Sequence, residues 1–284
     1  MVIKKVAMVG AGTMGNQIAM QVAICGFEVY CYSRKEATVA NARSYSDVWF
    51  AKSVEKGKLT DEAADQAKSR LKFTTDLKEA VTDADIVIEA VSDVLKTKKE
   101  ILGKIDQYTP DHTIYASNSS YIVSSLFADA VKHPENVLNV HFFNPALVMK
   151  LVEVVQGPHV SDDTVETVFE FIKSISKIPV LVRKEIYGFI VNRIFSAITK
   201  EACYMLDQGV ASIEDVDTAV KNGLGHPMGP FELLDMTGID LGYDVLMEKY
   251  KMTGDLSDKP SPAIVERYAR QEYGRKSKKG FYNY

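Results

Sequence analysis

The chain has 284 residues, of which 46% are hydrophobic and 25% charged, and its formal net charge is −4. This length suffices for one large or two moderate domains, and the acidic balance argues against non-specific binding of nucleic acid. Three cysteines without a CxxC spacing predict free thiols in a reducing compartment, with neither a disulfide framework nor a metal site. No charged leader with an apolar core and no apolar run of transmembrane length is present, so we expect a cytoplasmic protein without membrane association.

Residues 1–185 alternate short apolar runs with amphipathic stretches. Most runs are continuously apolar, which is typical of strands buried on both faces of a mainly parallel sheet. The runs are Val6–Val9, Val29–Tyr32, Ile86–Val91, Thr113–Ala116, Val137–Phe143, Leu151–Val155 and Pro179–Val182. The stretches between them suit helices, with one face formed by Ala63, Ala67, Arg70 and Leu71 and another by Val165, Val168, Phe169 and Ile172. This alternation predicts a doubly wound α/β domain.

A glycine-rich loop, Gly10-Ala11-Gly12-Thr13-Met14-Gly15, follows the first predicted strand and precedes a helical stretch. In such a GxGxxG loop, Gly10 allows the tight turn and Gly12 lets the backbone approach a pyrophosphate. Gly15 lets helix and strand pack closely, and the helix N-terminus faces the phosphates. The glycine triplet alone is weak evidence for a dinucleotide site, but here the strand, the loop, the helix and a second strand follow in the expected order. We therefore predict a Rossmann-type dinucleotide site in which Thr13 and Met14 also contact the cofactor.

The end of the second predicted strand sets the preference between NAD and NADP. A carboxylate there would bind the 2′-hydroxyl of NAD, whereas this chain has Ser33-Arg34 and no carboxylate before Glu36. Ser33 can donate to a 2′-phosphate and Arg34 can pair with it, which favours NADP. The alternative is that Arg34 is a solvated residue that stacks on adenine, with NAD still used.

A proton donor for a carbonyl reaction is expected at a residue that titrates near neutrality. Of five histidines, His141 lies where a buried strand ends, at the edge of the sheet where ligands of open α/β folds bind. Glu153 interrupts the apolar strand Leu151–Val155, and a buried carboxylate there needs a partner. The two residues are therefore a candidate acid–base pair. The alternative for Glu153 is a position on an edge strand facing water.

Residues 186–284 lose the strand pattern and are predicted to form an all-helical second domain. Gly209 is a candidate helix C-cap, and Ser212-Ile213-Glu214-Asp215 resembles a capping box. We expect this domain to complete a cleft or a dimer interface. Apolar residues recur at helical spacing before Gly209, at Ile186, Ile190, Ile194, Ile198 and Met205.

Several separate motifs, in order along the whole chain, resemble the short-chain 3-hydroxyacyl-CoA dehydrogenases, and most closely the stand-alone bacterial 3-hydroxybutyryl-CoA dehydrogenases. Together they are far more specific than any one of them. The matching segments are Val9–Gly15, Ala116–Ser120, His141–Pro145, Met149–Val154, Gly188–Arg193, His226–Pro230, Gly274–Ser277 and Lys279–Tyr282.

The resemblance implies roles for matching positions. His141 is the general acid and base, with Glu153 as its partner. Ser117 and Asn192 hold the reacting oxygen or the thioester of the substrate. The implied cofactor contacts beyond the glycine loop and the Ser33-Arg34 pair are Asp93, Lys98 and Asn118.

The resemblance also implies an acyl-CoA substrate and a homodimer formed through the C-terminal helices. Ser53 and Lys56, with Lys58 nearby, are candidates for the CoA phosphates, although lysine runs are more often solvated surfaces. The chain departs from the family's usual residues at three positions. Ser33 replaces the ribose-binding Asp, Asp93 replaces a Glu, and Tyr121 replaces a smaller residue.

The implied reaction interconverts acetoacetyl-CoA and (S)-3-hydroxybutyryl-CoA with NADP or NAD, in butyrate or other short-chain fatty acid metabolism. One alternative is a dehydrogenase of a different hydroxy acid on the same scaffold, which would not need the CoA moiety. Another is a non-catalytic nucleotide-binding relative, against which the ionisable pair His141 and Glu153 argues, because a structural protein gains little from such a pair.

Overall fold

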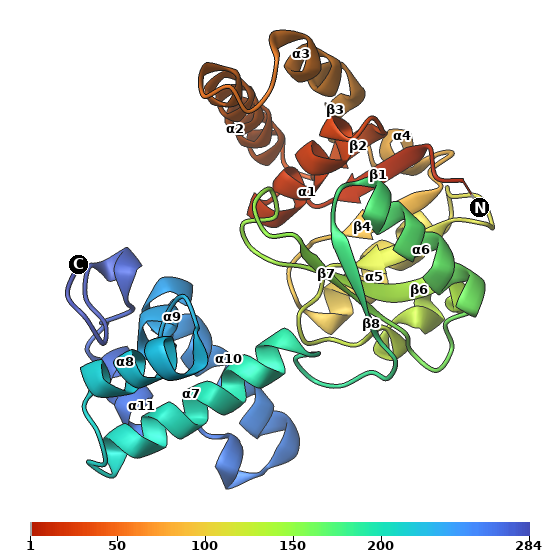
Figure 1. The fold of residues 1–284 in the computed structure, drawn as a ribbon. Coiled ribbons are helices and arrows are strands. Elements are labelled where there is room, and N and C mark those ends of the chain that lie inside the picture. Colours follow the sequence, from red (N-terminus) through yellow and green to blue (C-terminus); the bar gives the residue numbers. More distant parts are fainter. Residues whose placement is uncertain (1) are drawn as a thin grey trace. The chain divides into compact units, whose positions relative to one another are not determined.

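The computed structural model describes residues 2–284, which form two compact units that divide between Ile190 and Val191 (Figure 1). The expected boundary was 185/186. The segment between these points stays with the first unit, where the backbone N–H of Ile190 donates to Glu153. Positive φ angles at Gly188 (76°) and Phe189 (47°) keep the second unit's first helix from starting earlier.

The first unit contains an eight-stranded sheet of order β3-β2-β1-β4-β5-β6-β7-β8. All neighbouring strands are parallel except β6 and β7, so the last two strands run opposite to the other six. Their bounds are β1 (Lys5–Val9), β2 (Glu28–Tyr32), β3 (Leu71–Thr74), β4 (Ile86–Glu89), β5 (Ile114–Ser117), β6 (Val137–Phe142), β7 (Leu151–Val155) and β8 (Ile178–Val182). The predicted doubly wound, mainly parallel sheet is confirmed.

Helices cover both faces of this sheet. They are α1 (Thr13–Ile24), α2 (Glu36–Glu55), α3 (Asp61–Arg70), α4 (Leu77–Val81), α5 (Leu95–Ile105) and α6 (Asp162–Ser174). One prediction is wrong here: Leu71 does not continue the face of α3 but begins β3. The helix ends at Arg70 and passes directly into this edge strand.

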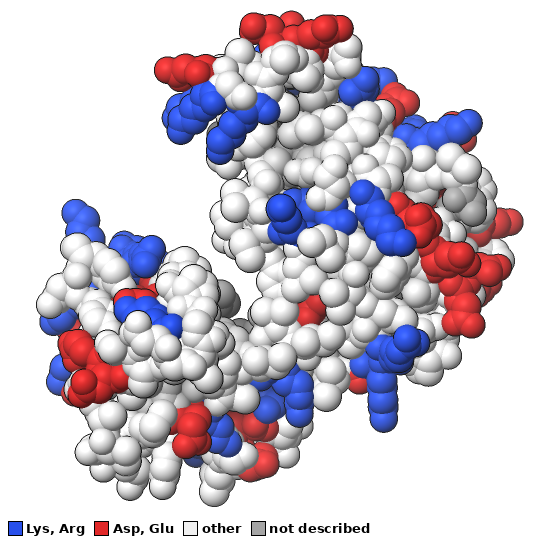
Figure 2. Space-filling view, viewed as in Figure 1, with Lys and Arg blue, Asp and Glu red and all other residues white. Residues whose placement is uncertain are grey.

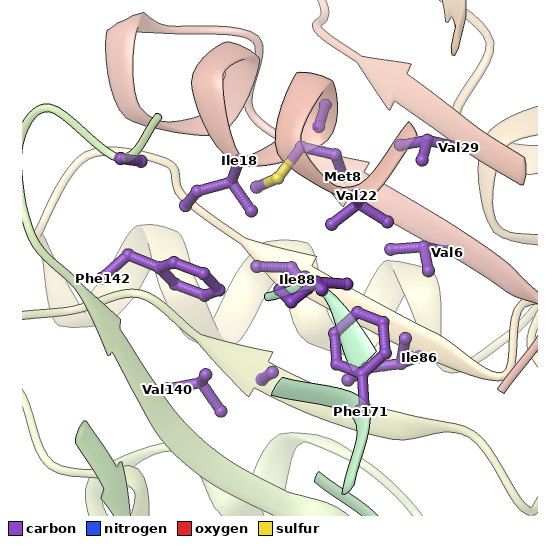
Figure 3. Packing of buried hydrophobic residues seen from close by; sticks show 14 of the residues in the cluster. Val6, Met8, Ile18, Val22, Val29, Ile86, Ile88, Val140, Phe142 and Phe171 are labelled. Atoms are coloured by element: carbon purple, nitrogen blue, oxygen red, sulfur yellow. The ribbon is translucent and has the colours of Figure 1, made fainter. Parts of the chain in front are cut away.

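Alternate residues of the central strands point into two separate cores, as expected for buried strands. Met8 of β1 packs with Ile18 of α1 and Phe171 of α6 on one face (Figure 3). Val9, the next residue, packs on the other face with Leu102 of α5. Burial of each such side chain contributes about 1.5–3 kcal/mol. This double layer holds the carboxyl ends of the strands, where the candidate site lies, in a fixed arrangement.

The second unit is built from α7 (Val191–Asp207), α8 (Ile213–Leu224), α9 (Pro230–Thr237), α10 (Ile239–Thr253) and α11 (Pro262–Ala269) around its own core. Ser212 caps α8 by accepting the N–H of Asp215, as predicted, and Gly209 follows α7 with a positive φ of 66°. Ile186 and Ile190, expected in the first helix, precede it. None of the helices in residues 2–284 is long and apolar enough to cross a membrane.

The end of the chain is not entirely helical, in contrast to the expectation, because the last α-helix ends at Ala269 and only the short 3-10 helix Arg275–Ser277 follows it. Isolated bridges join Gly274 to Lys279 and Lys279 to Asn283. The buried carboxylate of Asp235 on α9 accepts the backbone N–H groups of Phe281 and Tyr282 and the hydroxyl of Tyr284. The last residues are thereby attached to the helical core.

Candidate active site and nucleotide-binding loop

The glycine loop joins β1 to α1 and has two glycines that the chain's own packing requires. Gly10 has a φ of 116°, and a Cβ there would lie 2.5 Å from the carbonyl oxygen of Ala90. A Cβ at Gly15 would lie 1.8 Å from the carbonyl oxygen of Gly10. A Cβ at Gly12, by contrast, would meet no atom within 4 Å. The open side of the loop is therefore at Gly12.

The first turn of α1 has no side-chain cap and no acidic residue. The free N–H groups at this end, which include those of Thr13 and Met14, and the positive end of the helix dipole are available to an anion. Together with the open side at Gly12, this arrangement fits the pyrophosphate of a dinucleotide.

Beyond β2, the backbone N–H of Ser33 donates to the carbonyl oxygen of Thr74, 3.2 Å away, which fixes the turn into α2. The side chain of Arg34 is exposed, and the first acidic residue is Glu36 at the start of α2. The position that receives the adenine ribose in this fold thus has a hydroxyl and a guanidinium nearby.

His141 and Glu153 lie directly opposite each other in the antiparallel ladder of β6 and β7. The Nδ1 atom of His141 is 2.8 Å from Oε2 of Glu153, and the two side chains are 5% and 0% exposed. The second carboxylate oxygen accepts the N–H of Ile190 at 3.0 Å. Glu153 is therefore not an edge residue facing water, because β8 covers the other side of β7.

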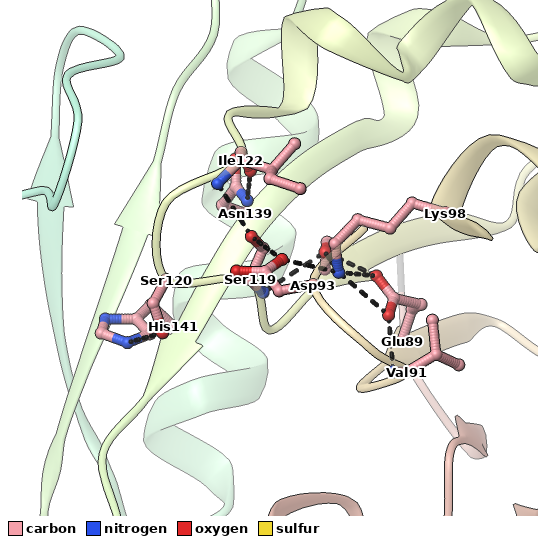
Figure 4. Close-up of polar contacts among 10 residues, drawn as sticks. Glu89, Val91, Asp93, Lys98, Ser119, Ser120, Ile122, Asn139 and His141 are labelled. Carbon is pink, nitrogen blue, oxygen red and sulfur yellow. Dashed lines mark hydrogen bonds and ion pairs between the residues drawn. The ribbon is translucent and has the colours of Figure 1, made fainter. Parts of the chain in front are cut away.

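The hydroxyl that reaches the other nitrogen of His141 belongs to Ser120. Its Oγ lies 3.1 Å from Nε2, as Figure 4 shows. The rings of Phe143 and Phe189, with centroids 4.6 and 5.6 Å from the imidazole, restrict the movement of His141. The imidazole is held between a carboxylate at one nitrogen and a hydroxyl at the other.

Ser117, which was predicted to hold the reacting oxygen or the thioester, lies in different surroundings from Ser120. It is the last residue of β5 and 2% exposed, and its Oγ donates to Oε2 of Glu89 at 2.7 Å. Sequence reasoning missed Ser120 because nothing in the run Ser117-Asn118-Ser119-Ser120 distinguishes the hydroxyls. The turn that follows β5 determines which one faces the histidine.

A buried ion pair lies close to Ser117 and was also missed. Lys98 Nζ is 2.9 Å from Oε2 of Glu89, with both side chains 1% exposed, and 3.3 Å from Oδ1 of Asp93. Ser119 donates to the same Asp93 oxygen at 2.5 Å (Figure 4). Two residues expected at the cofactor, Asp93 and Lys98, are thus in contact with each other.

Asn118 and Tyr121 complete the loop after β5. Oδ1 of Asn118 accepts the backbone N–H of Phe142 at 2.9 Å, which ties the loop to β6 beside His141. The ring of Tyr121 packs against Tyr187 with centroids 4.8 Å apart, and burial raises the pKa of Tyr121 to about 12. Tyr121 therefore stays a neutral phenol at physiological pH.

Residues 5–186 match the family model of the 3-hydroxyacyl-CoA dehydrogenase NAD binding domain, and residues 188–284 match that of the C-terminal domain. The chain belongs to the 3-hydroxyacyl-CoA dehydrogenase family. A 3-hydroxybutyryl-CoA dehydrogenase of Clostridioides difficile is 38% identical over 280 residues, covering 99% of each protein. The mitochondrial hydroxyacyl-coenzyme A dehydrogenase of Homo sapiens is 36% identical over 289 residues, covering 100% of this chain and 92% of that protein.

Among solved structures, (S)-3-hydroxybutyryl-CoA dehydrogenase PaaH1 from Ralstonia eutropha superposes with a TM-score of 0.93 at 35% identity, covering 100% of this chain and 99% of that one. Membership of the 3-hydroxyacyl-CoA dehydrogenase family makes the first unit a nicotinamide-cofactor domain.

The remaining residues nominated in this 3-hydroxyacyl-CoA dehydrogenase lie elsewhere. Ser53 is only 4% exposed near the end of α2, whereas Lys56 and Lys58 are exposed beyond it. Figure 2 shows basic and acidic side chains together over the α2–α3 hairpin. Asn192 is half-buried in the first turn of α7 and belongs to the second unit. Within residues 2–284, no group of three or more His, Cys, Asp or Glu side chains is arranged to hold a metal ion.

Proposed function

We propose that the protein interconverts acetoacetyl-CoA and (S)-3-hydroxybutyryl-CoA with a nicotinamide cofactor. The observation that carries the proposal is the 2.8 Å contact between His141 Nδ1 and Glu153 Oε2, at the carboxyl end of a nucleotide-binding sheet. Family membership supports the acyl-CoA class of substrate, and the names of the relatives support the four-carbon chain. The proposed substrate gives the protein a place in butyrate or other short-chain fatty acid metabolism in the cytoplasm.

The buried carboxylate gives each nitrogen of His141 a separate task. Glu153 accepts a hydrogen bond from Nδ1–H, so the neutral imidazole has its free lone pair at Nε2. Glu153 also stabilises the imidazolium, because a buried cation needs a counter-charge. Nε2 then gives a proton to the C3 oxygen in reduction and takes it back in oxidation. The bound nicotinamide supplies or receives the hydride at C3.

Ser120 positions the reacting oxygen in this proposal. Its hydroxyl lies 3.1 Å from Nε2, so an oxygen that exchanges a proton with Nε2 also comes within reach of Ser120. This assignment replaces Ser117, whose hydroxyl is buried against Glu89. Asn192 remains the residue proposed for the reacting oxygen or the thioester, and Asn118 the residue proposed for the nicotinamide ribose. Asp93 and Lys98 remain proposed cofactor contacts, and Ser53 and Lys56 remain proposed for the CoA phosphates.

Replacement of His141 by Ala tests the proposal. Loss of a positioned acid–base group costs about 10²–10⁴ in rate, so turnover of acetoacetyl-CoA falls by that factor while cofactor binding is retained. The matched control is His133→Ala, because His133 is exposed and pairs with its neighbour Glu135. Normal turnover in His141→Ala contradicts the proposal. Equal activity on free acetoacetate favours a hydroxy-acid dehydrogenase instead.

The cofactor in this proposal is NADP(H). The support is the hydroxyl of Ser33 and the exposed guanidinium of Arg34 at the end of β2, without a carboxylate to repel a 2′-phosphate. Steady-state kinetics with NADPH and NADH measure the preference directly. Ser33→Asp is expected to reverse it toward NADH, and a wild-type enzyme with a higher kcat/KM for NADH contradicts the assignment.

The functional form in this proposal is a homodimer joined through the second unit. Large apolar side chains there are more than half exposed, among them Ile194 (56%), Tyr204 (56%) and Leu241 (57%). Such exposure is typical of a surface covered by a partner. Light scattering coupled to gel filtration is expected to give twice the mass of 31.6 kDa, and a monomer at micromolar concentration contradicts the dimer.

A further inference from the structure

Glu89 is a fully buried carboxylate with no part in the proton transfer proposed above. It is the last residue of β4 and 1% exposed. Its Oε1 accepts the N–H of Val91 at 2.7 Å, and its Oε2 accepts the hydroxyl of Ser117 at 2.7 Å. Lys98 Nζ lies 3.1 and 2.9 Å from the two oxygens. These three donors provide hydrogen-bond partners for both buried carboxylate oxygens.

Lys98 is equally buried, although it lies beside residues expected at the cofactor. Its side chain is 1% exposed, and its ammonium contacts Glu89, Asp93 and Ser117. The member of this cluster that faces solvent is Asp93, whose side chain is 38% exposed. Asp93 is therefore the exposed carboxylate of the cluster, and Lys98 is its buried cation.

The position of Asp93 depends on the buried pair. Its Oδ1 is held by Lys98 Nζ at 3.3 Å and by Ser119 Oγ at 2.5 Å. The ammonium of Lys98 is in turn drawn toward Glu89, which is closer to it than Asp93 is. Without the charge of Glu89, the ammonium would have Asp93 as its single carboxylate among these contacts and would move toward it. The carboxylate of Asp93 would then turn inward, and its oxygens would accept hydrogen bonds from the lysine instead of from a ligand.

We infer that Glu89 is a positioning residue for cofactor binding. It keeps Lys98 back, so that Asp93 directs a free carboxylate oxygen toward the ribose hydroxyls of the nicotinamide half of the cofactor. A ribose hydroxyl donates to such an oxygen in a charge-assisted hydrogen bond. The inference rests on the proposed function in one respect, which is the contact between Asp93 and the cofactor.

A purely structural ion pair would join β4 to α5 without affecting the ligand, and a double-mutant cycle separates the two roles. The full-length protein is titrated with NADH and NADPH, with nucleotide fluorescence giving Kd, and the Tm of each variant is measured alongside. The variants are Glu89→Gln, Asp93→Asn and the double variant. The control is Glu100→Gln on α5, an exposed residue 3.9 Å from Lys96.

Glu89→Gln is expected to raise the Kd of the preferred cofactor by about 10- to 100-fold, the range found when a group that orients a metal-binding side chain is removed. Asp93→Asn is expected to raise it by a similar factor. In the Asp93→Asn background, Glu89→Gln adds less than threefold, because it acts through Asp93. The control keeps the wild-type Kd.

If the double variant raises the Kd by the product of the two single effects, the two residues act independently. That result overturns the inference and leaves Glu89 with a structural role. An unchanged Kd in Glu89→Gln, with a raised Kd in Asp93→Asn, also overturns it while leaving the proposed function intact. If the Kd is unchanged in Asp93→Asn, Asp93 does not bind the cofactor. Both the proposed contact and the inference are then wrong. If Glu89→Gln does not fold, Glu89→Gln combined with Lys98→Gln removes both buried charges. No ammonium then remains to draw Asp93 inward, so the Kd of this variant is expected to stay within threefold of the wild-type value; a Kd as high as that of Asp93→Asn overturns the inference.

Discussion

Replacement of Glu153 by Gln isolates the contribution of one charge to the proposed proton transfer. The two side chains have the same shape, and the amide oxygen of Gln can still accept the N–H of Ile190, now 3.0 Å from Oε1 of Glu153. The change is therefore confined to the oxygen that lies 2.8 Å from His141 Nδ1. That oxygen is replaced by a neutral N–H₂ group, which cannot compensate an imidazolium.

The expected loss follows from the strength of this contact. A hydrogen bond to a charged group contributes about 1.5–3 kcal/mol net. Both side chains are buried, at 5% and 0% exposure, so solvent does not weaken the interaction as it does for surface pairs. Since 1.36 kcal/mol corresponds to a factor of ten in rate, kcat/KM for acetoacetyl-CoA is expected to fall by about 10- to 150-fold.

The assay is steady-state reduction of acetoacetyl-CoA, together with a fluorescence titration of the cofactor and a thermal melt. Cofactor Kd is expected to stay at the wild-type value, because Glu153 acts on the substrate side. Glu170→Gln is the control, since Glu170 is an exposed residue of α6 that pairs with Lys173. A folded Glu153→Gln protein with kcat/KM within threefold of wild type would refute the role of the carboxylate.

Two further substitutions and one labelling experiment test other parts of the molecule. Gly15→Ala is expected to abolish cofactor binding in a fluorescence titration, because the new Cβ would lie 1.8 Å from a backbone oxygen of the glycine loop; wild-type Kd and Tm would contradict this. Asp235→Ala leaves three donors of the C-terminal tail without their acceptor, at about 1–3 kcal/mol each, so calorimetry is expected to show a lower Tm for the second unit. An unchanged Tm would show that water replaces the carboxylate. Burial raises the pKa of Cys31 to about 12 and that of Cys203 to about 11, so little reactive thiolate forms near pH 8. Mass spectrometry after brief alkylation is expected to find label on the half-buried Cys25 first, and equally fast labelling of Cys31 would contradict the burial argument.

The strands of the first unit were predictable because buried parallel strands are continuously apolar. The strand that was missed, β3, lies at the edge of the sheet and has the mixed sequence Leu71-Lys72-Phe73-Thr74. No glycine or proline separates it from α3, so its first residue matches the helical spacing as well as the strand. The start of α7 was placed too early for a similar reason, since Ile186 and Ile190 fit the helical period while the backbone at Gly188 and Phe189 interrupts it.

The candidate site was predictable where a single charged residue interrupted an otherwise apolar strand. A carboxylate inside an apolar strand needs a partner, so Glu153 and His141 could be nominated together. The sequence left open whether Glu153 faces water, because the place of a strand within its sheet is a tertiary property. Glu89 gave the same kind of signal, because it interrupts the predicted apolar run Ile86–Val91. Its partner was not nominated with it, because Lys98 lies on the helix that follows the strand rather than on a neighbouring strand.

The antiparallel pairing of β6 and β7 also determines which changes in chain length the site tolerates. The ladder places His141 opposite Glu153, and a shift of one residue in β6 or β7 would turn His141 or Glu153, respectively, to the other face of the sheet. Insertions in the connection between the strands leave this register intact, whereas a deletion inside either strand separates the pair. His141 and Glu153 are therefore brought together when the sheet forms, before any ligand binds. The free energy of ligand binding is then not reduced by a cost of assembling the pair.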